Sequence, residues 1–351
     1  MVDYLIVGAG FAGSVCAERL ASAGKTVLVV DQRAHIGGNA YDYYDEAGIL
    51  VHKYGAHIFH TNNKEVFDYL SRFTEWHPYQ HRVMARVGDH FVPMPINTTT
   101  LAQFGGDLQA AKRALIEPYT RKQWGPHADD LEPSVLARIR TRDDDEDRYF
   151  LDVYQGLPLH GYTRLFERLL AHPNIHLMLK TSYREVCDLL TDGGRVLPRR
   201  PAVIYTGPID EFFDYRFGRL PYRPARFVWS TTSRLEYAQE FAVINLPDPD
   251  HQYTRVVEFK RLTGQVHRST TRSWEYPTAD GEPYWPVPTA ASAALYQQYA
   301  ALAKQIPEVY FLGRLGSYKY LDMHQVVAQA LRLSTRLLGG DLTPVIDSDY
   351  S

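Results

Sequence analysis

Three glycines near the N-terminus have the spacing of a turn that binds a dinucleotide. Gly8, Gly10 and Gly13 stand between a short β-rich run and an Ala-rich helical stretch. In such a turn the first glycine permits the tight bend, the second lets backbone N–H groups approach a pyrophosphate, and the third allows close packing of the helix on the strand. Asp31 closes a second apolar strand, 18 residues after Gly13, where a carboxylate accepts hydrogen bonds from an adenosine ribose. The pattern predicts dinucleotide binding and leaves NAD and FAD open.

The residues after Asp31 favour FAD. Gly37 and Gly38 follow this acid, where an extended FAD would pass toward its isoalloxazine ring, whereas a nicotinamide-binding domain usually continues into a helix. Near the other end of the chain the pattern predicts a strand, a loop and a helix at residues 309–313, 314–323 and 325–338. Asp322 is a natural N-cap, and a helix N-terminus beside a flavin would stabilise the negative charge of the reduced ring. The cofactor-binding domain is therefore expected to combine both ends of the chain.

Length and composition exclude several classes of protein. The 351 residues allow about two domains, and a net charge of −3, from 38 basic and 41 acidic residues, provides no field for nucleic acid. Two cysteines cannot form a disulfide framework, the N-terminus lacks the pattern of a signal peptide, and no apolar run reaches the ~20 residues that span a bilayer. We expect a cytoplasmic protein without a membrane span or a nucleic-acid partner. The 25 tyrosines are unusual, because each buried hydroxyl needs a partner.

The middle of the chain alternates helical and extended patterns. The expected helical segments lie at 100–115, with a break at Gly105-Gly106, at the capped segment 133–136, and at 161–172. The expected strands lie at 175–179, 226–229, 241–244 and 255–259, the last three typical of an antiparallel sheet. The acidic run at 143–147 is typical of a solvated loop, and it predicts no metal site because no histidine or partner carboxylate accompanies it at a fixed spacing.

Longer motifs occur in order along the chain. They are GGNAY (37–41), HKYGAHIFHT (52–61), YTRKQWG (119–125), YTR (253–255), GRLG (313–316) and YLDM (320–323). Together they resemble the prokaryotic UDP-galactopyranose mutases, over a stretch from about residue 3 to residue 338. The resemblance implies a flavoenzyme that interconverts UDP-galactopyranose and UDP-galactofuranose for cell-wall or capsule polysaccharides. It also implies a requirement for reduced FAD without net redox change.

The patterns and the resemblance predict an α/β fold with three parts. A discontinuous, Rossmann-like FAD-binding domain is expected from residues 1–77, 200–220 and 305–345. A small helical domain is expected at 97–172, with a mobile loop near 130–148. An antiparallel β-sheet domain for the substrate is expected from residues 78–96 and 221–290.

The chemistry of such a reaction sets requirements for the site. Ring contraction breaks the anomeric C1–O bond while O5 is exchanged for O4, so a nucleophile must hold C1. N5 of reduced FAD can attack C1, expel UDP and form an iminium adduct. The departing UDP carries concentrated negative charge, so cations and hydroxyl-bearing aromatic residues are expected around its phosphates.

The resemblance implies roles for the matching residues. Arg138 corresponds to the arginine of a mobile loop over the diphosphate, Arg314 to one near flavin and phosphate, and His57 to the segment that meets the isoalloxazine. These three are the expected catalytic residues. The expected substrate-binding residues are His81, Thr120, Trp124, Tyr149, Arg223, Asn245, Arg255, Trp285, Tyr320 and Asp322. The expected cofactor-binding residues are Gly8, Gly10, Phe11, Ala12, Gly13, Asp31, Gln32, Gly38, Asn39, His57, Ile58, Arg314, Asp322 and Met323.

The chain departs from the family pattern at several positions. Trp285 stands where a second phosphate-binding tyrosine is common, and we expect its larger indole, which donates but cannot accept, to reshape the sugar-phosphate end. His81 and His324 stand where Asn and Asp are frequent, and Ala56 replaces a proline. Residues 100–119 form a shorter segment than in the family, where helices at this place contribute to the dimer and to the nucleotide cleft. This leaves a homodimer and a monomer both open.

Other functions also stay open at this point. A mutase of the same type could act on UDP-N-acetylgalactosamine or on a dTDP- or GDP-linked 6-deoxy sugar. The cofactor framework is shared with FAD amine oxidases and NAD(P)H-dependent oxidoreductases, which transfer electrons to oxygen or substrate. A flavin-binding protein without activity is a third alternative. For a mutase, the expected partners are the nucleotide sugar and a cellular reductant, either NAD(P)H or a flavin reductase.

Overall fold

Alternating apolar side chains place the first strand in a sheet that is covered on both faces. In β1 (Tyr4–Val7), the buried Ile6 and Leu5 point to opposite sides of the sheet. Four more strands pair in parallel in the order β10-β2-β1-β11-β18, and they are β2 (Val27–Asp31), β10 (Ile175–Leu179), β11 (Ala202–Tyr205) and β18 (Val309–Phe311). The computed structural model describes residues 2–132, 141–190 and 201–343.

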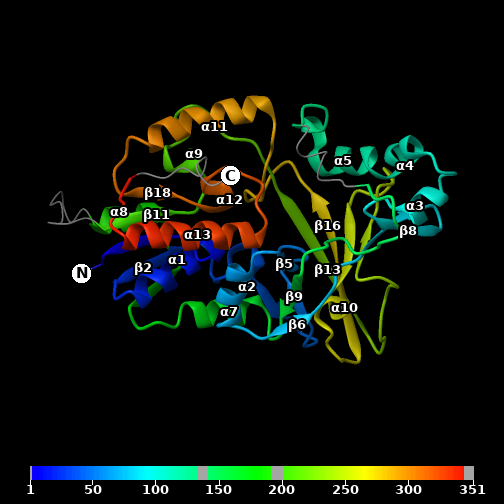
Figure 1. Cartoon of the computed structure of the whole chain (residues 1–351), viewed down its shortest axis with the longest axis horizontal. Coiled ribbons are helices and arrows are strands. Elements are labelled where there is room, and N and C mark those ends of the chain that lie inside the picture. Colours follow the sequence, from blue (N-terminus) through cyan, green and yellow to red (C-terminus); the bar gives the residue numbers. More distant parts are fainter. Residues whose placement is uncertain (1, 133–140, 191–200, 344–351) are drawn as a thin grey trace.

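Helices cover both faces of this parallel sheet (Figure 1). The face that carries Ile6 is covered by α1 (Phe11–Ser22), α13 (Met323–Leu338), α2 (Lys64–Ser71) and α7 (Tyr162–Leu169). The face that carries Leu5 is covered by α8 (Tyr183–Leu190), α9 (Ile209–Phe212) and α11 (Ala290–Ala303). We call the sheet with these helices the parallel lobe. Its strands come from both ends and the middle of the chain, which confirms the discontinuous Rossmann-like fold.

The helix predicted at 161–172 is present as α7, but it packs in the parallel lobe. Tyr162, Leu165, Phe166 and Leu169 are buried in the same core as α1, because their spacing puts all four on one face of the helix. The C-terminal part of the predicted helical domain (97–172) therefore belongs to the parallel lobe instead. Strand β10, predicted from its own apolar pattern, is the edge strand beside β2.

The second group of strands forms a six-stranded sheet in the order β13-β16-β15-β14-β7-β8. Neighbours in it are antiparallel except β14 and β7. The strands are β7 (Val83–Val87), β8 (His90–Met94), β13 (Ala225–Ser233), β14 (Val243–Asn245), β15 (Arg255–Glu258) and β16 (Ser269–Pro277). The helices that pack on it are α3 (Thr98–Ala102), α4 (Leu108–Leu115), α5 (Glu117–Trp124) and α10 (Phe259–Thr263). This antiparallel lobe contains the three strands that the sequence predicted.

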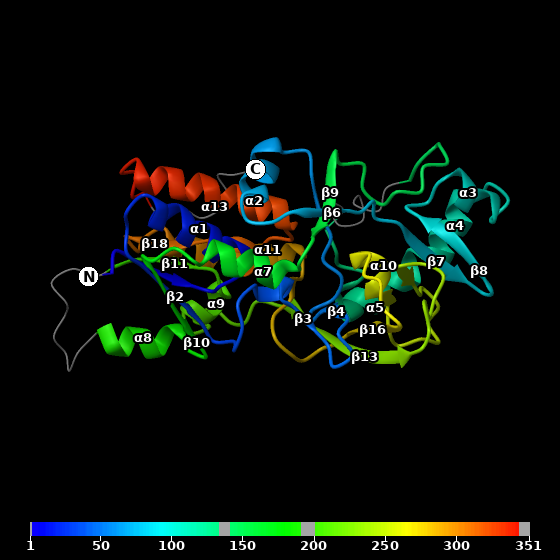
Figure 2. The same ribbon diagram turned by 90° about the horizontal axis from the view of Figure 1, so that it is seen from below.

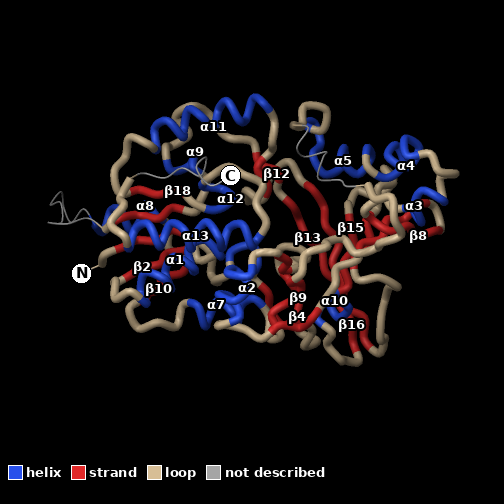
Figure 3. The backbone as a smooth tube through the Cα atoms, in the orientation of Figure 1, coloured by secondary structure: helices blue, strands red, loops and turns tan. Residues whose placement is uncertain are grey.

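Short sheets connect the two lobes, which lie side by side along the longest axis of the molecule (Figure 2). They separate the two large groups of strands in the backbone trace (Figure 3). One sheet consists of β5 (Phe59–Thr61), β9 (Tyr154–Pro158) and β6 (Trp76–Pro78). The others are the pairs β3 (Asp42–Tyr44) with β4 (Leu50–His52) and β12 (Tyr222–Arg223) with β17 (Trp285–Pro286).

Several local predictions can be compared with these elements. The predicted helix at 100–115 is divided into α3 and α4 on either side of Gly105-Gly106, as expected. The predicted loop at 314–323 instead begins with a short helix, α12 (Gly313–Gly316). Two further single turns are η1 (Gly38–Ala40) and η2 (Gly125–His127). Asp322 holds the predicted N-cap position of α13, where the Gln325 side chain accepts the Asp322 backbone N–H at 2.8 Å.

Residues 133–140 lie outside the described part of the chain, and with them the predicted capped segment and Arg138. On the two sides of this segment, Glu132 donates its backbone N–H to Pro288 O at 2.9 Å, and Arg142 donates its backbone N–H to Ile96 O at 2.8 Å. Among the helices of the described ranges, none is long and apolar enough to cross a membrane.

Candidate functional site

A cavity of about 620 Å³ lies at the carboxyl ends of the five parallel strands. Ligands of parallel α/β sheets bind at this edge, because the loops that follow the strands meet there. The predicted cofactor-binding residues that line the cavity are Gly8, Gly10, Phe11, Ala12, Asp31, Gln32, Gly38, Asn39, His57, Arg314 and Met323. The other three, Gly13, Ile58 and Asp322, do not line it.

The glycine turn fits the approach of a pyrophosphate. Gly8 has a φ of +106°, and a Cβ there would lie 2.0 Å from Thr206 Oγ1. A Cβ on Gly13 would lie 1.9 Å from Gly8 O, so Gly13 serves helix–strand packing rather than ligand contact. The N-cap of α1 is Gly10, and no side chain caps the first N–H groups of this 12-residue helix. These N–H groups and the helix dipole provide an anion site facing the cavity.

Asp31 organises the turn as well as facing the cavity. Its two carboxylate oxygens accept the backbone N–H groups of Ala9 and Arg33, each at 2.8 Å. The carboxylate is buried and keeps acceptor capacity for further hydrogen bonds. The predicted ribose contact is consistent with this position.

The residues that follow β10 and β11 also belong to the cavity, although they were not among the predicted cofactor-binding residues. Residues 181–184, Cys187 and residues 205–208 line the same cavity. The sequence indicates the first of these segments in part, because strand 175–179 was predicted and the residues after a parallel strand belong to the ligand-binding edge. Arg33 was also missed, and its guanidinium lies 4.6 Å from the Tyr54 ring centroid and 2.7 Å from Glu282.

His57 and Arg314 lie where the cavity meets the antiparallel lobe. Burial lowers the pKa of His57 to about 3, and the nearby His52 and Arg314 add to the effect. His57 is therefore neutral near pH 7. Its Nδ1 lies 2.9 Å from Gly55 O, which can only accept, so Nδ1 carries the proton and Nε2 is left as an acceptor. The Arg314 guanidinium donates to Leu321 O at 2.7 Å and lies 5.4 Å from the Tyr320 ring centroid.

Three polar residues stand side by side on neighbouring strands of the antiparallel sheet. Asn245 pairs with Arg255, and Arg255 pairs with Glu275; we call them the polar row. Arg255 donates to Tyr119 Oη at 2.6 Å, and its Nε lies 3.7 Å from Glu275 Oε2. Burial raises the pKa of Glu275, while Arg255 acts in the opposite direction.

The polar row has bonding capacity that the protein itself does not use. Within the described residues, no hydrogen-bond partner contacts the buried atoms Asn245 Oδ1, Arg255 Nε, Glu275 Oε1 and Gln123 Oε1. Gln123 lies on α5, one turn after Tyr119. Unpaired buried polar atoms are costly, and their concentration between α5 and the sheet is typical of a site for a polar ligand.

Tyrosines complete this cluster. Tyr149 donates its backbone N–H to His81 O at 2.6 Å, and the two rings are 5.6 Å apart. Loss of hydration raises the pKa of Tyr149 to about 12, although Arg255 lowers it. Burial lowers the pKa of His81 to about 3, with contributions from Arg255 and His60. The Tyr320 ring is 6.4 Å from that of Trp124. A protonated Tyr149 phenol and a neutral His81 thus lie close to Arg255.

Two of the expected substrate-binding residues make mainly structural contacts. Arg223 donates to Gln123 O at 2.7 Å, Thr278 O at 2.9 Å and Lys122 O at 3.1 Å, so its guanidinium holds the end of α5. Trp285 is buried and packs edge-on against Tyr284, with ring centroids 4.1 Å apart. Its neighbours include Trp124 in the same cluster. The predicted effect of Trp285 on the sugar-phosphate end would therefore act through Tyr284 and Trp124.

Comparisons with known proteins agree with this arrangement. A family model described as UDP-galactopyranose mutase matches residues 114–320, and one described as an NAD(P)-binding Rossmann-like domain matches residues 6–73. A probable UDP-galactopyranose mutase of Klebsiella pneumoniae is 35% identical over 96% of this chain and 94% of its own length. A dTDP-fucopyranose mutase of Escherichia coli is 34% identical over 94% of this chain and 97% of its own.

A solved structure shows the same fold at low sequence identity. A reduced UDP-galactopyranose mutase superposes with a TM-score of 0.75 and 14% identity, over 97% of this chain and 96% of that one. The match extends over both lobes and the short sheets between them.

Proposed function

This chain belongs to the UDP-galactopyranose mutase family, whose cofactor FAD fits the cavity of the parallel lobe, and we propose that it interconverts UDP-galactopyranose and UDP-galactofuranose. The reaction would need reduced FAD and no net electron transfer. The observation that supports this most is the polar row with its unused buried atoms, beside Tyr119 and Tyr149. Such a site suits a nucleoside diphosphate-sugar.

Each part of the site has a role in this proposal. Bound in its reduced form, FAD supplies a nucleophile for the anomeric carbon. Arg255 and Arg314 would balance the charge of the diphosphate as it departs and returns. The phenol of Tyr149, whose pKa is raised to about 12, stays protonated near pH 7 and can donate a hydrogen bond to a phosphate oxygen.

His57 would hold a proton at a defined atom. With its Nδ1–H directed at Gly55 O, the neutral Nε2 can accept a hydrogen bond from the reacting centre. The low pKa of His57 keeps the imidazole neutral, so it adds no positive charge beside Arg314. Thr120 and Trp124, both on α5, would contact the uridine and the sugar.

A mutase for another nucleotide sugar is the second candidate. The dTDP-fucopyranose mutase of Escherichia coli is almost as similar to this chain as the Klebsiella protein. In this proposal Arg255 donates to the diphosphate, which all these substrates share, and the unused acceptor oxygens of Asn245 and Glu275 face hydroxyl or N–H groups of the sugar or base. The choice of base and of sugar then depends on the residues around α5.

The experiment uses the dithionite-reduced holoenzyme under anaerobic conditions. UDP-galactofuranose, dTDP-fucofuranose and UDP-N-acetylgalactofuranose are incubated separately, and pyranose formation is followed by chromatography. We expect many turnovers of UDP-galactofuranose for each reducing equivalent consumed. Preferred turnover of another sugar would support the second candidate. An oxidoreductase would instead consume one equivalent of reductant for each product, and that result would contradict both.

Arg138 is tested separately because it lies outside the described residues. If it closes over the diphosphate, Arg138→Ala should lower kcat strongly and leave the flavin content unchanged. Loss of flavin from this variant would point to a structural role.

A further inference from the structure

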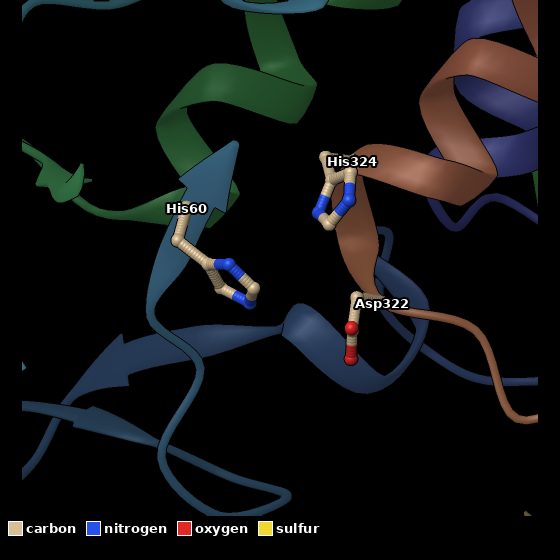
Figure 4. A group of neighbouring side chains, drawn as sticks. All are labelled: His60, Asp322 and His324. Carbon is tan, nitrogen blue, oxygen red and sulfur yellow. The ribbon is translucent and has the colours of Figure 1, made fainter. Parts of the chain in front are cut away.

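Three metal-binding side chains meet between β5 and the start of α13. Figure 4 shows His60 on β5, and Asp322 and His324 at the N-terminus of α13, with the three side chains gathered around one space. Their ligand atoms all lie within 4.8 Å of one another. Bonds of ~2.1 Å in a tetrahedral zinc site place ligand atoms about 3.4 Å apart. Small side-chain rotations are therefore enough to bring them onto one ion.

His60 is held in the orientation that a metal-binding histidine requires. Its ring stacks on Phe150 at 3.6 Å with an interplanar angle of 10°, and its Nδ1 lies 3.1 Å from Asp152 Oδ2. A carboxylate at Nδ1 fixes the proton there and leaves the Nε2 lone pair for a metal. The side chain is only 11% exposed, so these contacts hold its ring in place.

His324 provides a second free nitrogen. Its Nδ1 is buried, and none of the described residues makes a hydrogen bond to it. The His324 ring packs edge-on against the His60 ring, with centroids 5.2 Å apart. A buried imidazole nitrogen without a partner is costly in the free protein, and coordination of an ion would satisfy it.

Asp322 supplies an oxygen ligand and a negative charge. Its position at the N-cap of α13 fixes its backbone through the hydrogen bond to Gln325. A divalent ion at this point meets the positive end of the helix dipole, and the carboxylates of Asp322 and Asp152 offset that repulsion. Two imidazoles and one carboxylate form a donor set suited to Zn²⁺ and related ions.

We propose that His60, Asp322 and His324 form a binding site for one divalent transition-metal ion of the Zn²⁺ class, with Asp152 as the carboxylate that orients His60. The remaining coordination position is open to water. The sequence alone predicts no metal site in this chain, because the ligands come from two segments far apart in sequence.

The test is calorimetric titration of ZnCl₂ into the FAD-bound protein after dialysis against a chelator. We expect one tight site per chain. His60→Asn and His324→Asn should each weaken it at least 100-fold, and Asp152→Asn should weaken it about 10- to 100-fold, as for other carboxylates that orient a ligand. His176→Asn, which changes an exposed histidine of β10, is the matched control and should bind as the unchanged protein does.

Two results would overturn the proposal. One is the absence of a stoichiometric site in the unchanged protein. The other is equal affinity in the His324→Asn, His60→Asn and His176→Asn proteins. Flavin content and circular dichroism identify a variant that fails to fold. In that case X-ray absorption at the zinc edge of the unchanged protein tests the proposal, because the proposal requires two imidazoles around the ion.

Discussion

Neutral histidines lie near charged arginines in the site, His57 near Arg314 and His81 near Arg255. His57 and His81 each have a pKa lowered to about 3 by burial, whereas Arg255 and Arg314 keep their charge. Neutral imidazoles do not repel the guanidinium groups, and the positive charge that remains is concentrated where a diphosphate is proposed to bind. The residues thus combine hydrogen bonding with a local cationic field in a chain of net charge −3.

Arg255→Met is expected to lower kcat/KM by roughly 10- to 100-fold, because it removes a charge-assisted hydrogen bond that contributes about 1.5–3 kcal/mol. Flavin content should not change, because Arg255 does not line the cofactor cavity. Steady-state kinetics of the reduced enzyme and the flavin absorbance measure both effects. Arg86→Met, at an exposed position of β7, is the control and should keep full activity. Unchanged kinetics in Arg255→Met would show that the polar row does not bind the substrate.

Acid should destabilise the protein through the buried histidines. His52, with a pKa lowered to about 4, and His57 and His81, each lowered to about 3, are neutral when folded but titrate near 6.5 when unfolded. Between pH 6.5 and about 3 the unfolded state binds more protons, so stability that is complete above pH 6.5 is lost as the pH falls. Each histidine contributes about 2 kcal/mol of this loss between pH 7 and pH 5.

Urea denaturation at pH 7 and pH 5 measures that loss. His81→Asn should reduce the difference in unfolding free energy between the two pH values by about 2 kcal/mol, whatever its effect at pH 7. His176→Asn, at an exposed position, should leave the difference unchanged. An equal pH dependence in both variants would argue against a neutral, buried His81.

Helix α5 is tied to the loop between β14 and β15. Lys122 Nζ lies within hydrogen-bonding distance of the carbonyl oxygens of Leu246, Asp248, His251 and Tyr253, which share its three N–H donors. Partial burial lowers the pKa of Lys122 to about 8. Together with Arg223, this ammonium group holds the end of α5 over the polar row, which places Tyr119 against Arg255.

Lys122→Met should therefore affect both stability and substrate binding. It leaves several carbonyl groups without their donor, and we expect a loss of about 2 kcal/mol in the free energy of unfolding. Because α5 carries Tyr119 and Trp124, KM should rise several-fold while the flavin content stays the same. Arg121→Met, at an exposed neighbouring position, should change stability by less than about 0.5 kcal/mol. Similar behaviour of the two variants would mean that Lys122 does not position α5.

The glycine turn before α1 should tolerate no side chain at Gly13. The Cβ of an alanine would lie 1.9 Å from Gly8 O, so Gly13→Ala must push α1 away from β1 and disrupt the anion site. We expect most of the bound FAD to be lost, measured as the ratio of flavin to protein absorbance. Gly339→Ala, after the end of α13, is the control. A fully yellow Gly13→Ala protein would contradict this account of the turn.

At the scale of the whole molecule, the site lies where two lobes of different construction meet. The parallel lobe supplies the cavity, Arg314 and Asp322, and the antiparallel lobe supplies the polar row. Backbone pairs join them at several points, including Leu131 with Thr289 beside α11. Substrate groups and cofactor can therefore be held in one fixed relation.

Local rules explain what the sequence by itself determined. The glycine turn, the strands at both ends, Asp31 and the N-cap Asp322 follow from sterics and hydrogen bonding over a few residues, and the structure contains each of them. The family was also identifiable, because its motifs are long and occur in order.

Only the tertiary structure decided which distant side chains meet. The packing of α7 in the parallel lobe, the attachment of Arg223 to α5, and the approach of His60 to His324 depend on contacts between segments far apart in the chain. A sequence pattern records which residues are apolar or charged. It does not record their partners, because these are selected by the packing and hydrogen-bond energy of the complete fold.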